Sequence, residues 1–212
     1  MDLVGIRLGA PIMYESSYKF DKAAVIKRCE DLATATPGFD RIAMNIEIGD
    51  AGTTVVGQFA NSNFDPLDQS NQPHTWPELQ GFVEWLGPIA NKIFCNWEYD
   101  FDTISITNSW VNRHRKGGWT NFHVHRNSHL SVAAYIQADE DSGHLLMADP
   151  LENHWGGYPV IRQAEINGGY TLPVKDNTVY LFAPFIRHGT EASKSKKDRW
   201  VLSLNLHAYK GN

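Results

Sequence analysis

The spacing of hydrophobic residues changes about halfway along the chain of 212 residues. In the first half, two stretches show the period of about 3.6 residues that is typical of helices burying one face. Residues 20–35 are one of them, with Val25 and Cys29 one turn apart on the apolar face. Residues 75–95 are the other, and we expect Pro88 to kink or break this helix because its ring cannot continue the hydrogen-bond ladder.

From about residue 101 onward, short apolar and β-branched stretches alternate with turns rich in Gly, Asn and Asp. Many short strands separated by such turns are typical of a sandwich or barrel. We therefore predict a mainly β fold with flanking helices, whose core is a jelly roll of about eight strands. The chain is interpreted as a single domain, 1–212, in which 1–100 supplies supporting helices and strands and 101–212 forms the core. The expected strands are 42–49, 53–60, 102–114, 120–125, 129–137, 144–149, 168–174, 178–184 and 199–210.

Composition narrows the class of protein. With 42% hydrophobic residues, the chain can bury one sizeable core. The net charge of -5 argues against a general nucleic-acid binder, and the basic run 194–199 is interpreted as a solvated turn. The two cysteines form no CxxC motif, which favours a reducing compartment. The sequence shows neither a signal peptide nor an apolar run of about eighteen residues, so we expect a cytoplasmic protein without a membrane span.

Histidines are concentrated in the stretch "GGWTNFHVHRNSHLSVAAYI", residues 117–136. His123 and His125 are separated by one residue, so on a strand their side chains point to the same face. Phe122 and Val124 then occupy the other face, where we expect them to pack against a sheet. The pair by itself is compatible with two metal ligands and equally with two satisfied polar side chains.

A second group of polar residues follows the strand expected at 178–184. His188 comes first, then a charged turn, then Arg199 at the start of the last strand. Alternation places Arg199, Ser203 and Asn205 on one face of that strand. If Arg199 points inward it must meet an anion, because a buried, unpaired guanidinium costs several kcal/mol. The alternative is an arginine at the sheet edge, paired with a nearby carboxylate.

These motifs resemble the Fe(II)- and 2-oxoglutarate-dependent oxygenase superfamily. Its members have a His-x-Asp/Glu pair, a distal histidine about sixty residues later, and an Arg or Lys roughly ten positions beyond. More narrowly, "HVHRNSHLSVAAYI", "MADP" and "LFAPFIRHGTEASKSKKDRWVLSLN" are similar to a small oxygenase family of marine phages and bacteria. The resemblance covers about half of the chain, from about residue 110 to residue 207. It implies a double-stranded β-helix (jelly roll) core.

The resemblance also implies a metal site. It assigns Fe(II) to His123, His125 and His188, with His125 at the position where most relatives have a carboxylate. If His125 were not a ligand, Asp149 or a water molecule would be the replacement. The remaining nearby histidine, His129, is expected to support the ligands or to pack against neighbours rather than to bind the metal.

A pocket for the cosubstrate 2-oxoglutarate is implied as well. Arg199 would hold the distal carboxylate with its planar fork, and Ser203 would add a hydroxyl from the same face. Tyr135 matches a tyrosine that reaches this carboxylate in relatives. Further residues that could line the pocket are Ser131, Asn205, Trp110 and Asn112.

The activity implied is hydroxylation of a C–H bond, with conversion of 2-oxoglutarate to succinate and CO2. The substrate would be a protein or peptide side chain or a small molecule, and residues 150–163 are a candidate lid. Enzymes of this kind often form homodimers, although no interface signature is visible in the sequence. Two other classes stay open. One is a cupin-type metalloprotein without a keto acid, and the other is a non-enzymatic β-sandwich that serves as a binding or structural module.

Overall fold

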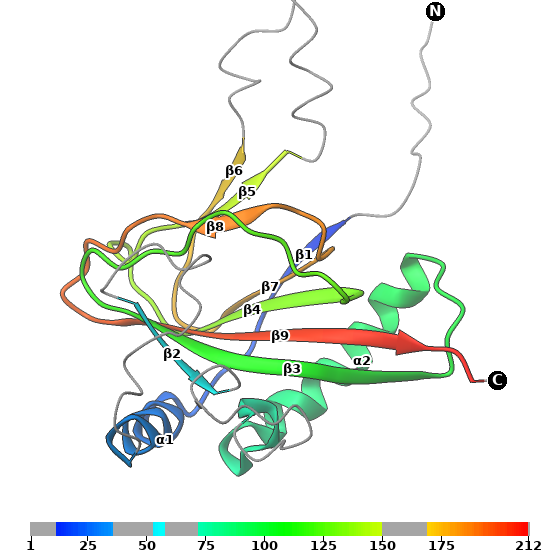
Figure 1. Ribbon diagram of the computed structural model, residues 1–212, viewed down its shortest axis with the longest axis horizontal. Coiled ribbons are helices and arrows are strands. Elements are labelled where there is room, and N and C mark those ends of the chain that lie inside the picture. The colour runs from blue at the N-terminus through cyan, green and yellow to red at the C-terminus, as the bar shows by residue number, and fades with distance from the viewer. Residues whose placement is uncertain (1–11, 36–52, 58–71, 150–168, 212) are drawn as a thin grey trace, which may run out of the picture.

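Two β-sheets packed face to face make up most of the computed structural model, which describes residues 12–35, 53–57, 72–149 and 169–211 (Figure 1). The larger sheet has the strand order β1-β7-β4-β9-β3-β2, and the smaller has the order β6-β5-β8. All neighbouring strands of both sheets are antiparallel. The strands are β1 (Met13–Ser17), β2 (Thr53–Gly57), β3 (Thr103–His114), β4 (Leu130–Gln137), β5 (Leu145–Ala148), β6 (Gly169–Leu172), β7 (Thr178–Phe182), β8 (His188–Thr190) and β9 (Arg199–Tyr209).

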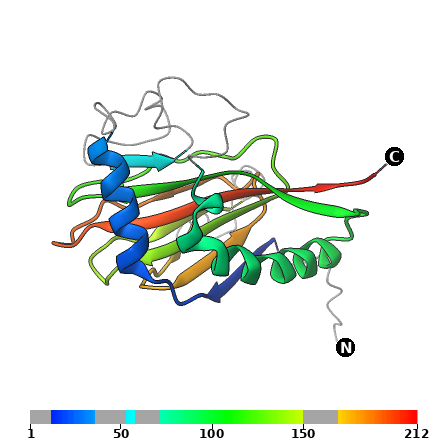
Figure 2. The same ribbon diagram turned by 90° about the horizontal axis from the view of Figure 1, so that it is seen from below.

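Both α-helices cover the outer face of the larger sheet (Figure 2). They are α1 (Lys22–Ala35) and α2 (Gln80–Asn96), and the short 3-10 turns η1 (Pro73–Thr75) and η2 (Pro77–Leu79) lead into α2. This arrangement confirms the predicted mainly β fold with flanking helices and a jelly-roll core. β2 lies within the strand predicted at 53–60, whereas β1 corresponds to no predicted strand, and the two form the edges of the larger sheet.

Strand β9 shows how alternation builds two separate cores. Its outward side chains Trp200, Leu202, Leu204 and Leu206 are buried with the helices. Its inward residue Val201 packs in a second core between the sheets, together with Tyr135 from β4 and Met147 from β5. The inward face of the larger sheet is therefore the one that can carry a buried site.

The two helices differ in how well the sequence predicted them. Helix α1 begins as expected, because the Asp21 carboxylate accepts a hydrogen bond from the Ala24 backbone N–H at 3.2 Å. Helix α2 continues through Pro88, so the expected break is wrong. Pro88 and Glu84 are both exposed, so the Glu84 carbonyl, which loses its helical donor, lies on the exposed side of the helix. Burial of the opposite face, at Leu86 and Ala90 among others, holds the helix together across this point.

Two further expectations concern residues that the structure does not describe. The strand expected at 42–49 and the candidate lid at 150–163 lie outside the described residues.

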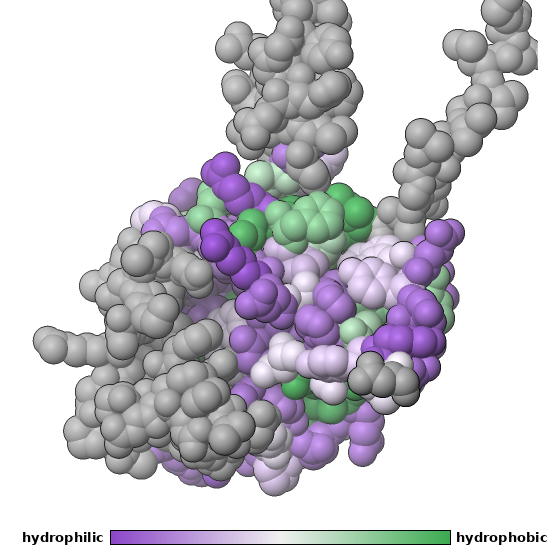
Figure 3. Space-filling model, turned by 45° about the vertical axis from the view of Figure 1, so that its right-hand side comes forward, coloured by the Kyte–Doolittle hydropathy of each residue, from purple (hydrophilic) through white to green (hydrophobic). Residues whose placement is uncertain are grey.

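No helix in the described part of the chain is long and apolar enough to cross a membrane. On the face shown in Figure 3, most described residues are hydrophilic, and hydrophobic surface is confined to small patches.

Candidate metal centre

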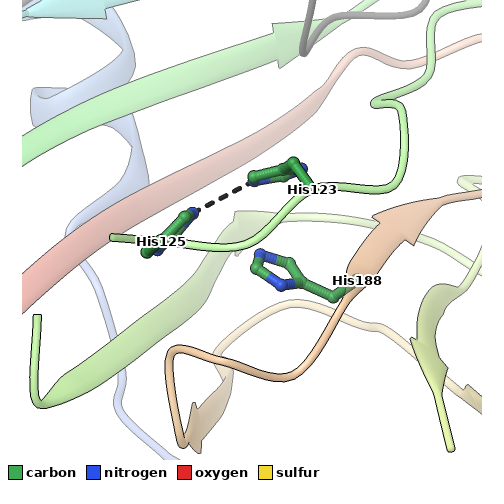
Figure 4. A group of neighbouring side chains, drawn as sticks. All are labelled: His123, His125 and His188. Carbon is green, nitrogen blue, oxygen red and sulfur yellow. Dashed lines mark hydrogen bonds between the residues drawn. The ribbon is translucent and has the colours of Figure 1, made fainter. Parts of the chain in front are cut away.

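Three histidine side chains meet between the two sheets, and they are the three that the sequence singled out. His123, His125 and His188 point toward one another (Figure 4), and each offers a ring nitrogen within 4.8 Å of the others. The Nε2 atoms of His123 and His125 are 3.0 Å apart. The ring of His188 lies 4.3 Å from that of His123 and 4.9 Å from that of His125, centroid to centroid.

The local structure that brings these side chains together differs from the expected one. Residues 121–129 form no regular strand, and His123 makes only an isolated bridge to His188. Backbone hydrogen bonds link the two histidines in both directions, at 2.9 and 3.0 Å, and His125 N–H donates to the Pro184 carbonyl at 3.0 Å. Because β8 has only three residues, it cannot impose strict alternation on its neighbour. Phe122 is accordingly 44% exposed, so the expectation that it packs against a sheet is wrong.

Each of the three imidazoles is held through its Nδ1 atom. This nitrogen lies at hydrogen-bonding distance from a carbonyl oxygen, which can only accept, so Nδ1 must carry the proton. A neutral ring then presents its Nε2 lone pair to the common centre, as is usual for histidine ligands of metals. The three acceptors are the backbone oxygen of Asn121 for His123 (2.8 Å), the Oδ1 of Asn205 for His125 (2.7 Å) and the backbone oxygen of Ile186 for His188 (2.9 Å).

This arrangement fits a divalent metal ion. Burial, and to a lesser extent the neighbouring His123, lower the pKa of His125 to about 3. Burial also holds the pKa of His188 well below its usual range. With Nδ1 carrying the proton in both rings, the Nε2 lone pairs of His123 and His125 face each other, and a cation between them would stabilise this arrangement. Three imidazoles on one side leave further positions open for exogenous ligands, which suits Fe(II).

The two other candidate ligands lie elsewhere. His129 stacks on His207 with ring centroids 3.7 Å apart, and its Nδ1 accepts a hydrogen bond from the Ala208 backbone. Asp149 is not part of the group of three histidines that the described residues form. The structure thus brings together the three predicted ligands and neither of these alternatives.

Ser131 and Asn205, predicted to line the cosubstrate pocket, lie against the predicted ligand His125. They face each other across the pairing of β4 with β9, and the Ser131 hydroxyl donates to Asn205 Oδ1 at 2.9 Å. Both also lie at hydrogen-bonding distance from His125 Nδ1. The indole of Trp110 lies with its ring 5.5 Å from that of His125. These residues fix the orientation of the unusual middle histidine.

Arg199 points inward and is fully buried, with no exposed surface. Its guanidinium donates to the hydroxyl of Thr190 at 2.8 Å and to the backbone carbonyls of Ser142, Gly143 and Glu191. Thr190 is two residues beyond His188 on β8, a separation of about 7 Å along an extended strand. The guanidinium therefore lies one strand period from the histidine group, between the same two sheets.

The surroundings of Arg199 are built to hold it. Gly143 adopts a φ of +78°, and a side chain there would come within 2.9 Å of the Glu191 carbonyl oxygen that accepts from Arg199. Tyr135 is buried close enough to Arg199 to feel its charge. Burial raises the pKa of the Tyr135 hydroxyl, and the charge of Arg199 lowers it. Ser203 lies on the same inward face of β9 as Arg199 and Val201. Thr190, Ser142 and Gly143 have no sequence signal that would have singled them out, because strand β8 and the turn at 142–143 meet the arginine only in the folded chain.

The buried histidines predict a pH dependence. Burial is the main cause that lowers the pKa of His114, His125 and His188 below 6.5, so the unfolded chain binds more protons than the folded one below that pH. We expect the free energy of unfolding of the metal-free protein to fall below about pH 6.5, each histidine adding up to about 1.4 kcal/mol per pH unit. Urea denaturation at pH 7.5 and 5.5 measures this, and equal stabilities at the two values would contradict it.

Gly189 predicts a packing effect on the metal site. A Cβ there would lie 2.8 Å from the Thr120 carbonyl oxygen and 3.1 Å from the Phe122 backbone nitrogen. Gly189→Ala should push this segment away from β8 and displace His123, lowering metal affinity about 10- to 100-fold, as loss of a supporting contact does. Metal titration measures the change. The control is Gly87→Ala, at an exposed position of helix α2 where a Cβ meets nothing within 4 Å. This variant should leave metal affinity unchanged and add about 0.5–1 kcal/mol to the free energy of unfolding.

A family model matches the part of the chain that contains these residues. Residues 108–205 match the model of a family described as "Putative 2OG-Fe(II) oxygenase", and this stretch contains the three histidines and Arg199. No curated protein matches the chain. The family match and the fold are those of Fe(II)- and 2-oxoglutarate-dependent oxygenases.

Solved structures share the fold at low sequence identity. A prolyl-4-hydroxylase from Pseudomonas putida has a TM-score of 0.59 at 10% identity, covering 94% of each chain. OsALKBH1 has a TM-score of 0.61 at 16% identity, covering 94% of this chain and 100% of that one. HygX from Streptomyces hygroscopicus, solved with nickel, 2-oxoglutarate and hygromycin B, has a TM-score of 0.55 at 12% identity, covering 93% and 83%. These likenesses confirm the double-stranded β-helix.

Proposed function

We propose that this oxygenase is a dioxygenase that hydroxylates a C–H bond while converting 2-oxoglutarate to succinate and CO2. One observation carries the proposal: three Nε2 lone pairs converge one strand period from a buried guanidinium. A keto acid with a second carboxylate at its far end needs this pair of partners, a metal at one end and a cation at the other. A cupin-type metalloprotein would have no use for the buried Arg199.

The roles of the residues follow from their places. His123, His125 and His188 would hold Fe(II), which supplies the oxidising chemistry together with O2 and the keto acid. Arg199 would orient the distal carboxylate, with Ser203 and Tyr135 on the same inward face. The apolar core between the sheets keeps bulk water from the pocket, and Phe182 is part of this wall, with its ring 4.6 Å from that of His188.

The direction from which a substrate arrives can be proposed from β9. Its inward face is buried as far as Asn205, half-buried at His207 and 45% exposed at Tyr209, whereas the outward face stays buried. The rings of Tyr99, His129, His207 and Tyr209 form a row along this opening, with neighbouring centroids 5.2, 3.7 and 4.7 Å apart. We propose that the substrate approaches the metal over this row.

The substrate class is a protein or peptide side chain or a small molecule. Phe122 and Phe185, which flank the ligand positions in the chain, are 44% and 62% exposed and offer apolar contacts. Arg187 lies over the Phe122 ring at 5.3 Å and adds positive charge. Among the similar folds, a prolyl hydroxylase from Trichoplax adhaerens was solved with a peptide fragment of hypoxia inducible factor. Proline-containing peptides are therefore the first group to screen.

Further proposals concern the chain as a whole. We propose that 1–212 acts as a single domain, that 1–100 supports the core 101–212, and that the protein is cytoplasmic. The two cysteines are both free, with Cys29 buried and Cys95 exposed, which supports a reducing compartment. A homodimer is proposed because enzymes of this kind often form one. Analytical ultracentrifugation of the purified protein measures its oligomeric state and tests this proposal.

An anaerobic titration tests the proposed function. Apoprotein receives Fe(II) and then 2-oxoglutarate while the visible spectrum is followed. We expect a weak charge-transfer band that requires both additions, and formation of succinate once O2 is admitted. Metal binding without a band would favour the cupin-type alternative. Absence of metal binding would favour a non-enzymatic binding module.

A further inference from the structure

A further histidine, which is buried, lies beside the arginine of the proposed pocket. His114 is the last residue of β3 and pairs with Arg199, the first residue of β9. Residues that pair across antiparallel strands point to the same face of the sheet, so both side chains enter the space between the sheets. Only 1% of His114 is exposed.

The imidazole of His114 has one nitrogen engaged and one without a partner. Its Nε2 is 2.8 Å from the Thr120 hydroxyl. Its Nδ1 is buried and has no hydrogen-bond partner within the described part of the chain. Because nearly all buried polar atoms in folded proteins are hydrogen-bonded, this nitrogen needs an explanation, and an absent ligand is one.

His114 and Arg199 are linked by hydrogen bonds through Thr120 and Thr190. The Thr120 backbone N–H donates to the Thr190 hydroxyl at 2.9 Å, and an Nη atom of Arg199 donates to that same hydroxyl at 2.8 Å. Burial and the charge of Arg199 lower the pKa of His114 well below its usual range, so the ring is neutral. A neutral imidazole next to a buried guanidinium can donate one N–H to an anion without adding repulsion.

We propose that His114 is a second ligand for the anion that Arg199 binds. On the proposed function, on which this inference rests, the anion is the distal carboxylate of 2-oxoglutarate. The Thr120 hydroxyl donates to Nε2, which leaves the proton on Nδ1, and Nδ1–H donates to a carboxylate oxygen. His114 is thus a specificity-determining residue that favours keto acids with a second carboxylate.

The competing role for His114 is structural, as an anchor for Thr120 through Nε2. Two substitutions separate the roles, because an asparagine amide can occupy the place of Nδ1 and a glutamine amide the place of Nε2. His114→Asn keeps a donor toward the proposed anion and loses the contact to Thr120. His114→Gln keeps the contact to Thr120 and loses the donor toward the anion.

The experiment measures the Kd of 2-oxoglutarate for the Fe(II)-loaded wild type and both variants, without O2. 2-Oxopentanoate, which lacks the distal carboxylate, is the control ligand. We expect His114→Gln to weaken 2-oxoglutarate about 10- to 100-fold, the range for a hydrogen bond to a charged group, and His114→Asn to weaken it less. The Kd of 2-oxopentanoate should be the same in all three proteins.

Other outcomes overturn the inference. Wild-type affinity in His114→Gln, or a parallel weakening of both keto acids, would assign His114 the structural role. If the wild type itself bound no 2-oxoglutarate, the proposed function would fail first. Should both variants unfold, ¹⁵N NMR of the histidine rings in the Zn(II)-loaded wild type gives the answer, since the Nδ1 signal of His114 must move when 2-oxoglutarate is added. An unmoved signal would overturn the inference.

Discussion

His188→Ala is expected to abolish Fe(II) binding. His188 is 5% exposed and donates through Nδ1 to the Ile186 carbonyl, so its Nε2 is fixed toward the other two ligands. Loss of a supporting contact alone costs a metal site about 10- to 100-fold in affinity, and loss of a ligand should cost more. Metal content after dialysis, together with Fe(II) titration of the apoprotein, measures the effect.

A histidine outside the group is the matched control for this result. His129→Ala removes a half-buried imidazole that stacks on His207 and does not reach the metal group. It should keep the wild-type metal content. If His188→Ala retained iron, or if both variants lost it equally, the three-histidine site would be wrong.

The middle ligand has a sharper variant of its own. His125→Asp converts three imidazoles into the two-histidine, one-carboxylate set that commonly binds non-heme Fe(II). We expect metal binding to be kept or tightened, although the new side chain gives up the contact of Nδ1 with Asn205. Loss of metal in a folded variant would show that His125 is not a ligand.

Arg199→Ala should leave the metal in place and weaken 2-oxoglutarate. Removing one partner of a buried ion pair costs about 3–5 kcal/mol, which is roughly two to three and a half decades in affinity. The variant should also be less stable, because the buried carbonyl of Ser142 loses a donor and an unsatisfied buried group costs about 1–3 kcal/mol. The Kd of 2-oxoglutarate for the Fe(II) form and a urea melt measure the two effects.

Arg113→Ala is the control for the arginine. Arg113 lies opposite Trp200 in the pairing of β3 with β9, on the outward face, and its ion pair with Asp198 is 2.6 Å long and partly exposed. Ion pairs of this kind contribute about 0–1 kcal/mol, so stability should change little and cosubstrate affinity not at all. Equal affinity for 2-oxoglutarate in Arg199→Ala and the wild type would remove Arg199 from the pocket.

The alternation of inward and outward side chains along a strand correctly predicted which residues share a face where the strand is long. In β9, with eleven residues, the pattern separated the outward Trp200 and Leu202 from the inward Arg199 as the structure does. Regular pairing on both sides forces each side chain to one face, so a period of two is reliable there. The three-residue β8 lacks this constraint, and alternation failed beside it at Phe122.

The sequence by itself determined the mainly β fold and its flanking helices, because periodicity is a local property of the chain, and its resemblance to known oxygenases singled out the three histidines and Arg199. Tertiary structure alone decided what these residues meet. It set Ser131 and Asn205 against His125, closed the Ser142–Gly143 turn over Arg199, and left His114 beside that arginine with an unpartnered nitrogen. Such contacts join residues up to 85 positions apart, and they are created by the pairing of strands distant in sequence rather than by any local pattern.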